Sequence, residues 1–137
     1  MNPSATAAQA PIRPTDLLAE ARGYYHEARC KLATTHVVDH IIYADPEVTR
    51  EAAALAFLAA LKAIDGYALA RRYARPPMAI EEYQEVVSAM PYPLGRIIQV
   101  RLGVVYQNLN MLAYQAGGVE VEMIKSGFRR AREIIDA

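Results

Sequence analysis

The polar side chains best suited to binding chemistry lie in the second half of the chain, within a long aliphatic stretch. Tyr106, Asn110 and Tyr114 recur at intervals of four, which places them on one face of a helix, and Arg101 and Asn108 lie nearby in the sequence. Asn is a poor helix former, and a buried amide needs hydrogen-bond partners. This face therefore predicts a polar groove for a ligand or partner, or a polar seam at a dimer interface; internal hydrogen bonding is the structural alternative. The face contains no general base, so it supports binding and no catalytic residue is assigned.

Asp65 is the discordant residue of the long apolar stretch from Asp45 to Arg72. A buried carboxylate is costly unless it is paired, and Lys62, Arg72 or a tyrosine could pair with Asp65. The tyrosine and asparagine face described above is one candidate partner. A catalytic carboxylate would need a second acid nearby, and the sequence identifies none. We therefore favour a structural role for Asp65 and keep it as a candidate for binding a ligand or partner.

His36 and His40 are separated by four residues, so in a helix they could share one metal ion, with Asp39 between them. A protein metal site nearly always needs a third ligand. His26 and Cys30 fall on other turns of the same predicted helix. We therefore predict no metal site and no cofactor, and interpret the two histidines as part of a partly exposed helix end.

Two arginine clusters could contact phosphate groups. They are Arg71, Arg72 and Arg75 in one predicted helix, and Arg129, Arg130 and Arg132 in another. Each cluster lies in the last turns of its helix, where cations are favourable in any case, so a solvated helix end is the simpler interpretation. The chain has 15 Lys and Arg against 15 Asp and Glu, and this zero net charge argues against a dedicated duplex-binding protein. The sequence shows no glycine-rich phosphate loop, nucleophile elbow or zinc-finger spacing.

The elements that position these residues follow from the spacing of aliphatic side chains. Residues 1–14 contain Ala, Pro, Ser and Thr without a period and predict a flexible leader, and residues 15–137 predict one domain. We expect helices over about 15–37, 45–72, 80–90, 94–116 and 119–136. Thr15 is the expected N-cap of the first helix, Asp45-Pro46 starts the second, and Gly117-Gly118 ends the fourth.

The helix over 45–72 is apolar nearly all the way round, so it needs neighbours on several sides. The helices over 94–116 and 119–136 each show a single inward stripe of side chains. The first stripe is Leu94, Ile98, Leu102, Val105, Leu109 and Leu112, and the second is Val121, Ile124, Phe128, Ala131 and Ile135. This pattern predicts an all-α protein, an antiparallel up-and-down four-helix bundle with an additional short helix.

The sequence also indicates a compartment. A single cysteine, Cys30, cannot form an intramolecular disulfide, which fits a reducing environment. Charged residues such as Arg50, Lys62 and Asp65 interrupt the central apolar stretch, so we expect no membrane-spanning segment. The N-terminus lacks the order of a signal peptide. These features predict a soluble cytoplasmic protein.

Several short segments, taken in order, resemble a known fold family. They are Tyr24-Tyr25 with Glu27-Ala28, Tyr43-Ala-Asp45 with Val48, Ala-Leu-Lys-Ala-Ile-Asp65-Gly-Tyr67, Glu81-Glu82-Tyr83, Tyr106-Gln-Asn-Leu109-Asn110 with Tyr114 and Gly117, and Gly127-Phe128-Arg-Arg-Ala131. The pattern from Tyr24 to Ile135 resembles HEPN-type helical bundles, and within them a small bacterial family of HEPN-like domains of unknown function.

The resemblance implies a helical bundle and a dimer. HEPN ribonucleases carry an Arg followed four to six residues later by a His on a late helix, and two such motifs meet at a dimer interface to cleave RNA without metal. Arg96 and Arg101 are the candidate arginines here, but no histidine follows His40, and Asn110 stands where the small family places one. An amide cannot act as a general acid or base near neutral pH, so the resemblance does not extend to RNA cleavage.

We therefore expect a non-catalytic helical bundle that acts through protein association, as a homodimer, using apolar surface on the helix over 45–72 or on the helix over 94–116. The alternative is a degenerate HEPN-type domain that binds RNA or nucleotide, or that partners a nucleotidyltransferase. The arginine clusters distinguish this alternative, because RNA affinity through them would depend steeply on salt. A ribonuclease is disfavoured by the missing histidine.

Overall fold

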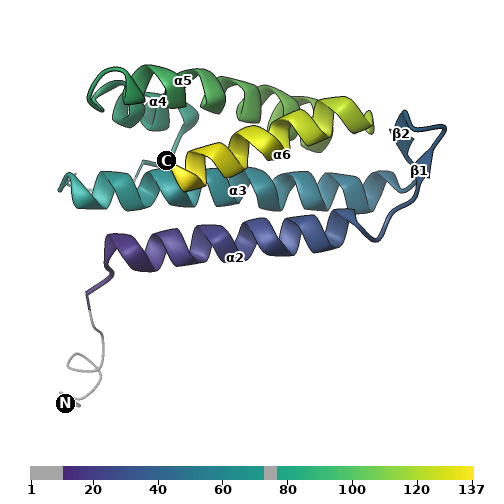
Figure 1. Ribbon diagram of the computed structural model, residues 1–137, viewed down its shortest axis with the longest axis horizontal. Helices are drawn as coiled ribbons and strands as arrows, with labels where there is room; N and C mark the ends of the chain where they lie inside the picture. The colour runs from purple at the N-terminus through teal and green to yellow at the C-terminus, as the bar shows by residue number, and fades with distance from the viewer. Residues whose placement is uncertain (1–10, 73–76) are drawn as a thin grey trace, which may run out of the picture.

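Helices dominate the computed structural model, which describes residues 11–72 and 77–137 (Figure 1). The elements in chain order are α2 (Pro14–Leu32), β1 (Val37–Val38), β2 (Ile42–Tyr43), α3 (Pro46–Ala70), α4 (Ile80–Ser88), α5 (Leu94–Val105), the π-helix η1 (Tyr106–Gln115) and α6 (Val121–Asp136). Helices α2 and α3 lie side by side and antiparallel, the α5–η1 helix lies on the other side of α3, and α6 crosses obliquely between them. The predicted all-α helical bundle is confirmed.

Helix α3 is the central helix of the bundle. Its start is as predicted, because the Asp45 side chain caps it by accepting hydrogen bonds from the backbone N–H groups of Glu47 and Val48 at 3.1 and 3.2 Å. Small residues let the neighbouring helices approach its backbone closely, and those that are fully buried are Ala52, Ala53, Ala56, Ala59 and Ala60. The core therefore forms around an alanine-rich helix, with larger side chains supplied by its neighbours.

Helix α3 is also the single described helix that is long and apolar enough to cross a membrane by length and composition, which the sequence argument did not anticipate. It packs against α2, α6 and η1, and 44% of its most apolar window is buried inside the bundle. Because α3 is covered on several sides by other helices, its apolar side chains serve packing within the bundle.

The start of α2 differs from the prediction. The helix begins at Pro14 with Arg13 as its N-cap, two residues earlier than a Thr15 cap requires. Pro suits the first helical position because its fixed φ is already helical and it has no N–H to leave unpaired. The Asp16 carboxylate accepts the backbone N–H of Arg13 at 3.0 Å and completes the cap. Residues 1–10 of the predicted leader lie outside the described residues.

The expected continuation of this helix to Val37 is wrong, because α2 ends at Leu32 and a β-hairpin follows. Strands β1 and β2 pair antiparallel, with Val38 opposite Ile42, and the turn between them contains Asp39 and His40 at φ of 52° and 61°. β-branched residues favour strands, and short polar residues tolerate positive φ better than most, so the local sequence suits a hairpin. The hairpin also pairs with the chain that leads into α6, where the Val121 N–H donates to the Ile41 carbonyl at 2.8 Å.

The predicted helix over 94–116 is continuous, but its second half is a π-helix. The hydrogen bonds of a π-helix join residues five apart, so each turn holds more residues than an α-turn. This shifts the inward position, and Ala113 is fully buried where Leu112 was expected, while Leu112 is exposed. Gly117, with φ of +73°, ends the helix as predicted, and its N–H donates to the Ala113 carbonyl at 3.1 Å.

Helix α6 buries the predicted stripe of Val121, Ile124, Phe128, Ala131 and Ile135. It packs closely against η1 at Gly127, where a Cβ would lie 2.5 Å from Leu109 Cδ2 and 3.2 Å from the Asn108 Cβ. A side chain at this crossing would force Leu109 or the helices to move.

Candidate functional site

The arginine of the predicted polar face, Arg101, takes part in an internal ion pair. Its Nε donates to Glu133 Oε2 at 2.6 Å, and Arg130 donates to both carboxylate oxygens of Glu133 at 2.8 and 2.9 Å. One carboxylate on α6 thus holds an arginine from α5 and one from its own helix. Both guanidinium groups are engaged within the chain, so Arg101 and Arg130 would have to leave Glu133 to contact a ligand or phosphate as predicted.

The other residues of the predicted polar face make contacts in different parts of the bundle. The ring of Tyr106 lies 6.0 Å from that of Phe57 on α3, and Asn108 donates through Nδ2 to the Met123 carbonyl at 2.9 Å. Asn110 is partly buried, and Tyr114 is exposed. The prediction assumed α-helical spacing, and the π-helix changes which residues align. These residues therefore do not converge with Arg101 or Asp65 on one groove.

Asp65 meets Tyr83 of the short helix α4, a residue that sequence reasoning did not single out for this role. Burial raises the pKa of the Asp65 carboxyl, and the hydrogen bond from Tyr83 and the charge of Lys62 offset part of this rise. Burial also raises the pKa of the Tyr83 hydroxyl, and the hydrogen bond to Asp65 adds to the rise. The second oxygen of the carboxylate, Oδ1, is buried without a hydrogen-bond partner among the described residues. The Asp65–Tyr83 pair joins α3 to α4 within the bundle.

The two histidines considered for metal binding lie in the hairpin and not on a helix, so the assumed helical spacing is wrong for them. His36 precedes β1, and His40 lies in the turn. On the preceding helix, His26 Nε2 lies 3.6 Å from the sulfur of Cys30, and both side chains are exposed. Over residues 11–72 and 77–137, no three His, Cys, Asp or Glu side chains come together as a metal site would require.

In the arginine cluster at the end of α3, Arg71 contacts a tyrosine of its own helix. Arg71 donates to the Tyr67 hydroxyl at 2.6 Å, and its guanidinium carbon lies 4.9 Å from the centre of the Tyr67 ring. Arg72 is exposed, with φ of 61°, and Arg75 lies outside the described residues. The side chain of Arg71 thus packs onto the last turns of its own helix, as cations at helix ends commonly do.

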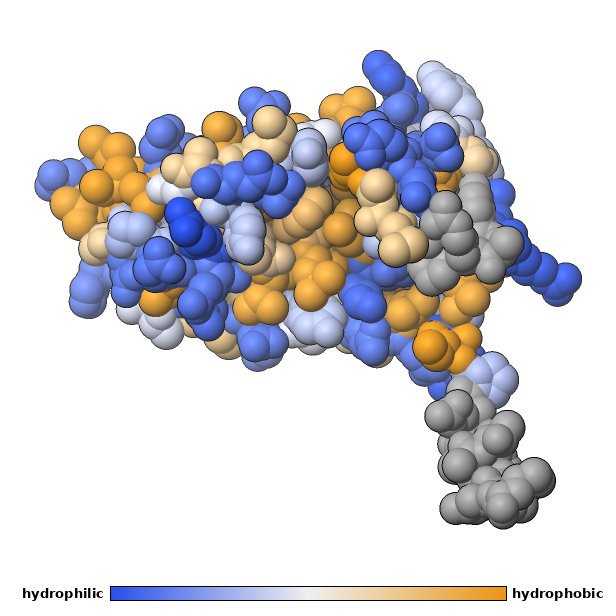
Figure 2. All heavy atoms as spheres, turned by 180° about the vertical axis from the view of Figure 1, so that it is seen from behind, coloured by the Kyte–Doolittle hydropathy of each residue, from blue (hydrophilic) through white to orange (hydrophobic). Residues whose placement is uncertain are grey.

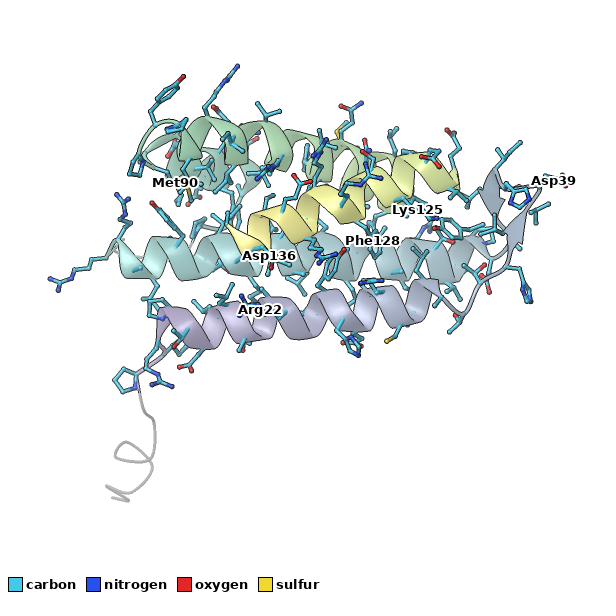
Figure 3. The ribbon with its side chains drawn as sticks, viewed as in Figure 1. Arg22, Asp39, Met90, Lys125, Phe128 and Asp136 are labelled. Carbon is cyan, nitrogen blue, oxygen red and sulfur yellow. The ribbon has the colours of Figure 1, made fainter. Side chains whose placement is uncertain are left out.

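A groove between α2 and α6 gathers cations that the sequence placed far apart. We call it the basic groove, with a volume of about 470 Å³ and lining residues Tyr25, Arg29, Leu32, Ala33, Thr35, Val37, Tyr43, Lys125, Phe128, Arg129 and Arg132. Figure 3 shows Lys125 and Phe128 on α6, above α2. Of the arginines predicted as possible phosphate contacts, Arg129 and Arg132 line this groove, and Arg29 and Lys125 were not predicted.

The floor of the basic groove is apolar and fixed. The Tyr25 hydroxyl donates to the Phe128 carbonyl at 3.1 Å, and the two rings lie 6.0 Å apart with a tilt of 52°. Burial raises the pKa of Tyr25, while the nearby charges of Arg29 and Arg132 act to lower it. The spacing of Lys125, Arg129 and Arg132 along α6 was visible in the sequence; the place of Arg29 opposite them depends on how α2 packs.

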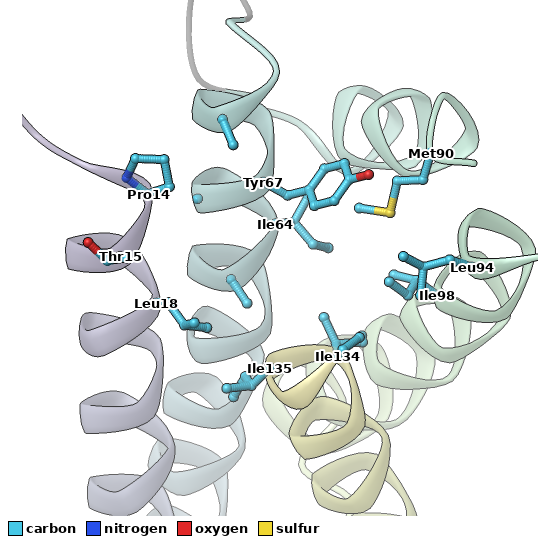
Figure 4. Close-up of a pocket in the computed structure, with 14 residues that line it drawn as sticks. Pro14, Thr15, Leu18, Ile64, Tyr67, Met90, Leu94, Ile98, Ile134 and Ile135 are labelled. Atoms are coloured by element: carbon cyan, nitrogen blue, oxygen red, sulfur yellow. The ribbon is translucent and has the colours of Figure 1, made fainter. Parts of the chain in front are cut away.

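An apolar pocket of about 240 Å³ lies at the opposite end of the bundle from the hairpin (Figure 4). Leu18, Tyr67, Met90, Ile98 and Ile134 are among the side chains that point into it, from α2, α3, the connection after α4, α5 and α6. Its lining is almost entirely aliphatic, so it offers few groups that would orient a polar ligand.

Exposed apolar side chains form a further surface on the α5–η1 helix. We call it the outer stripe, made of the exposed Ile97, Val100, Met111 and Tyr114 and the partly buried Val104. Ile97 is 41% exposed, Val100 54%, and Met111 and Tyr114 46% each. Apolar side chains also gather in a band across the face seen from behind and at the hairpin end (Figure 2). The molecule therefore exposes apolar side chains that are not part of its core.

Comparison with known proteins places this fold in a family. No curated protein matches the chain. A solved structure of a protein of unknown function from Dyadobacter fermentans shares the fold, with a TM-score of 0.75 and 24% sequence identity over 91% of this chain and 95% of that one. Residues 16–137 match the family described as a domain of unknown function, DUF5618, from the first turn of α2 to the last residue. The chain therefore belongs to the DUF5618 family.

Proposed function

We propose that this protein is a non-catalytic helical bundle that acts through protein association, and that it forms a homodimer through the outer stripe of α5 and η1. The observation that carries the proposal is the set of exposed apolar side chains on this one helix. The resemblance to HEPN-type bundles is consistent with a dimer, and the lack of any histidine after His40 is consistent with a non-catalytic role.

The spacing of the outer stripe suits a second helix. Ile97, Val100 and Val104 lie in the α-helical half at intervals of three and four residues, while Met111 and Tyr114 follow in the π-helix η1 and belong to the stripe by their exposure. Apolar positions that alternate at three and four residues are the pattern by which two helices pack side by side. In a symmetric dimer the same stripe would meet its own copy, so each apolar residue would be covered by another.

The electrostatics of the chain favour a second copy over a charged partner at this surface. The net charge is zero, so two copies do not repel each other. The polar residues that flank the stripe include Gln99 and Gln107, and the nearby Arg101 is neutralised by Glu133. Low charge and exposed aliphatic or aromatic side chains are typical of the buried centre of protein interfaces.

The test is the mass of the protein in solution. At high micromolar concentration, light scattering should give twice the chain mass of 15.1 kDa. Val100→Glu places a charge at the most exposed position of the stripe and should give a monomer. The matched control is Ile41→Glu, which makes the same change on the exposed hairpin turn and should leave the dimer intact. A monomeric wild-type protein, or a dimer lost only in Ile41→Glu, would refute the proposal.

A further inference from the structure

The basic groove carries charge that the rest of the chain does not neutralise. Elsewhere several cations are paired, Lys31 with Glu51 at 2.7 Å, Lys62 with Glu20 at 3.8 Å, and Arg101 and Arg130 with Glu133, while others such as Arg22 and Arg96 are exposed without a carboxylate within ion-pair distance among the described residues. In the groove, Arg132 lies 3.6 Å from Asp136, but Arg29, Lys125 and Arg129 have no carboxylate within ion-pair distance among the described residues. In a chain of zero net charge, this local excess marks a surface that attracts an anionic partner.

These cations line both sides of the basic groove. Lys125, Arg129 and Arg132 recur at four and three residues, so they share one face of α6 and span about 10 Å along it at ~1.5 Å per residue. Arg29 faces them from α2 across the groove. An anionic segment lying along the groove would therefore meet positive charge on both sides.

The floor distinguishes between classes of anionic partner. Proteins that hold single-stranded nucleic acid stack its bases on exposed aromatic rings. Here Phe128 is 6% exposed and Tyr43 5%, and the Tyr25 hydroxyl is already bonded to the Phe128 carbonyl. Tyr25 alone of these three is partly exposed, so the groove lining offers no row of open rings to successive bases. Leu32 and Val37 instead add aliphatic surface, which suits an apolar side chain.

We propose that the basic groove binds an acidic segment of another protein, one or two of whose apolar side chains enter the floor while its carboxylates contact Arg29, Lys125, Arg129 and Arg132. The volume of about 470 Å³ lies within the range of pockets that hold small ligands. This surface is formed by α2 and α6 and the outer stripe by α5 and η1, so the acidic segment binds without using the dimer contacts. The inference does not depend on the proposed homodimer.

The test uses a fluorescein-labelled peptide, Glu-Glu-Leu-Glu-Glu-Phe-Glu-Glu, and the full chain. Binding measured by anisotropy at low salt should weaken as salt rises, because the contacts are charge pairs near the surface. Lys125→Ala/Arg129→Ala should lower the affinity by about tenfold or more. The control Arg71→Ala/Arg96→Ala removes the same charge from exposed arginines outside the groove and should leave the affinity within about twofold of wild type.

Two further probes make the result specific. A peptide with Ser in place of Leu and Phe has the same charge and should bind several-fold more weakly, because its side chains would bury little apolar surface against the floor. A single-stranded oligonucleotide with the same number of charges should bind more weakly than the Leu/Phe peptide at matched salt. Equal affinity loss in both double variants, equal binding of the Ser peptide, tighter binding of the oligonucleotide, or no peptide binding at low salt would each overturn the proposal.

Discussion

The basic groove and the outer stripe are both uncovered surfaces, but they differ in whether the nearby cations are paired with carboxylates. In the groove, three cations have no acidic partner among the described residues, and the apolar side chains form a mostly buried floor. On the stripe, apolar side chains are exposed and the nearby Arg101 is neutralised by Glu133. If both proposals hold, one small bundle has two kinds of association, one sensitive to salt and one driven by apolar burial.

The largest effect is expected from a charge placed on the outer stripe. Val100→Glu should weaken the dimer by at least about 100-fold, or roughly 3 kcal/mol, because an unpaired carboxylate would be buried at the interface. Sedimentation equilibrium would measure the change. The same variant should bind the acidic peptide as wild type does, and a parallel loss of peptide binding would show that the two surfaces are not separate.

The next largest effect is expected where α6, which carries the groove, crosses η1, which carries part of the stripe. In Gly127→Ala the new Cβ would lie 2.5 Å from Leu109 Cδ2, so the buried Leu109 side chain or the two helices must move. We expect a loss of about 2 kcal/mol in the free energy of unfolding, measured by urea denaturation. Gly103→Ala is the control, because a Cβ at Gly103 meets nothing within 4 Å. Equal stability of the two variants would contradict the close crossing.

A smaller effect is expected from the ion pair that joins α5 to α6. Glu133→Gln keeps the shape of the side chain but removes the charge that holds Arg101 and Arg130. The side chains of Arg101, Arg130 and Glu133 are 30%, 38% and 26% exposed. Because solvent partly screens these charges, we expect a loss of about 1 kcal/mol in the free energy of unfolding. The released arginines should also make dimer formation more sensitive to salt. Unchanged salt dependence would show that Arg101 does not border the interface.

The smallest effect concerns the Asp65–Tyr83 pair, which lies apart from both surfaces. Because burial raises the folded pKa of Asp65, its protonated form stabilises the fold at acidic pH, and this contribution is lost as pH rises through the folded pKa. Asp65→Asn should therefore be more stable than wild type near neutral pH, and the difference should shrink as pH falls. Thermal melts across this range measure it. A variant less stable than wild type at neutral pH would contradict the assigned cause.

The sequence predicted the fold better than the site, for identifiable reasons. Asp45-Pro46, Gly117 and the stripe of α6 are local signals, and each was confirmed. The hairpin was missed because its valines and isoleucines follow a helix without a glycine or proline break. The π-helix was missed because its side chains do not differ in type from those of an α-helix, and its wider turns exposed Leu112.

The candidate site depends on packing across the chain, which spacing alone does not reveal. Arg129 and Arg130 look equivalent in the sequence, yet one lines the groove and the other is held by Glu133. Arg29 joins the groove only because α2 lies beside α6. Asp65 was identified as a residue to inspect, but its partner Tyr83 comes from the short helix and not from the tyrosine and asparagine face.

In the proposed homodimer, the outer stripe brings two copies of this chain together. The most direct test is the mass of the wild-type protein by light scattering at high micromolar concentration, in low salt and again in high salt. We predict twice the chain mass of 15.1 kDa in both conditions, because an apolar interface is not weakened by screening. A mass of one chain in both conditions would contradict the account.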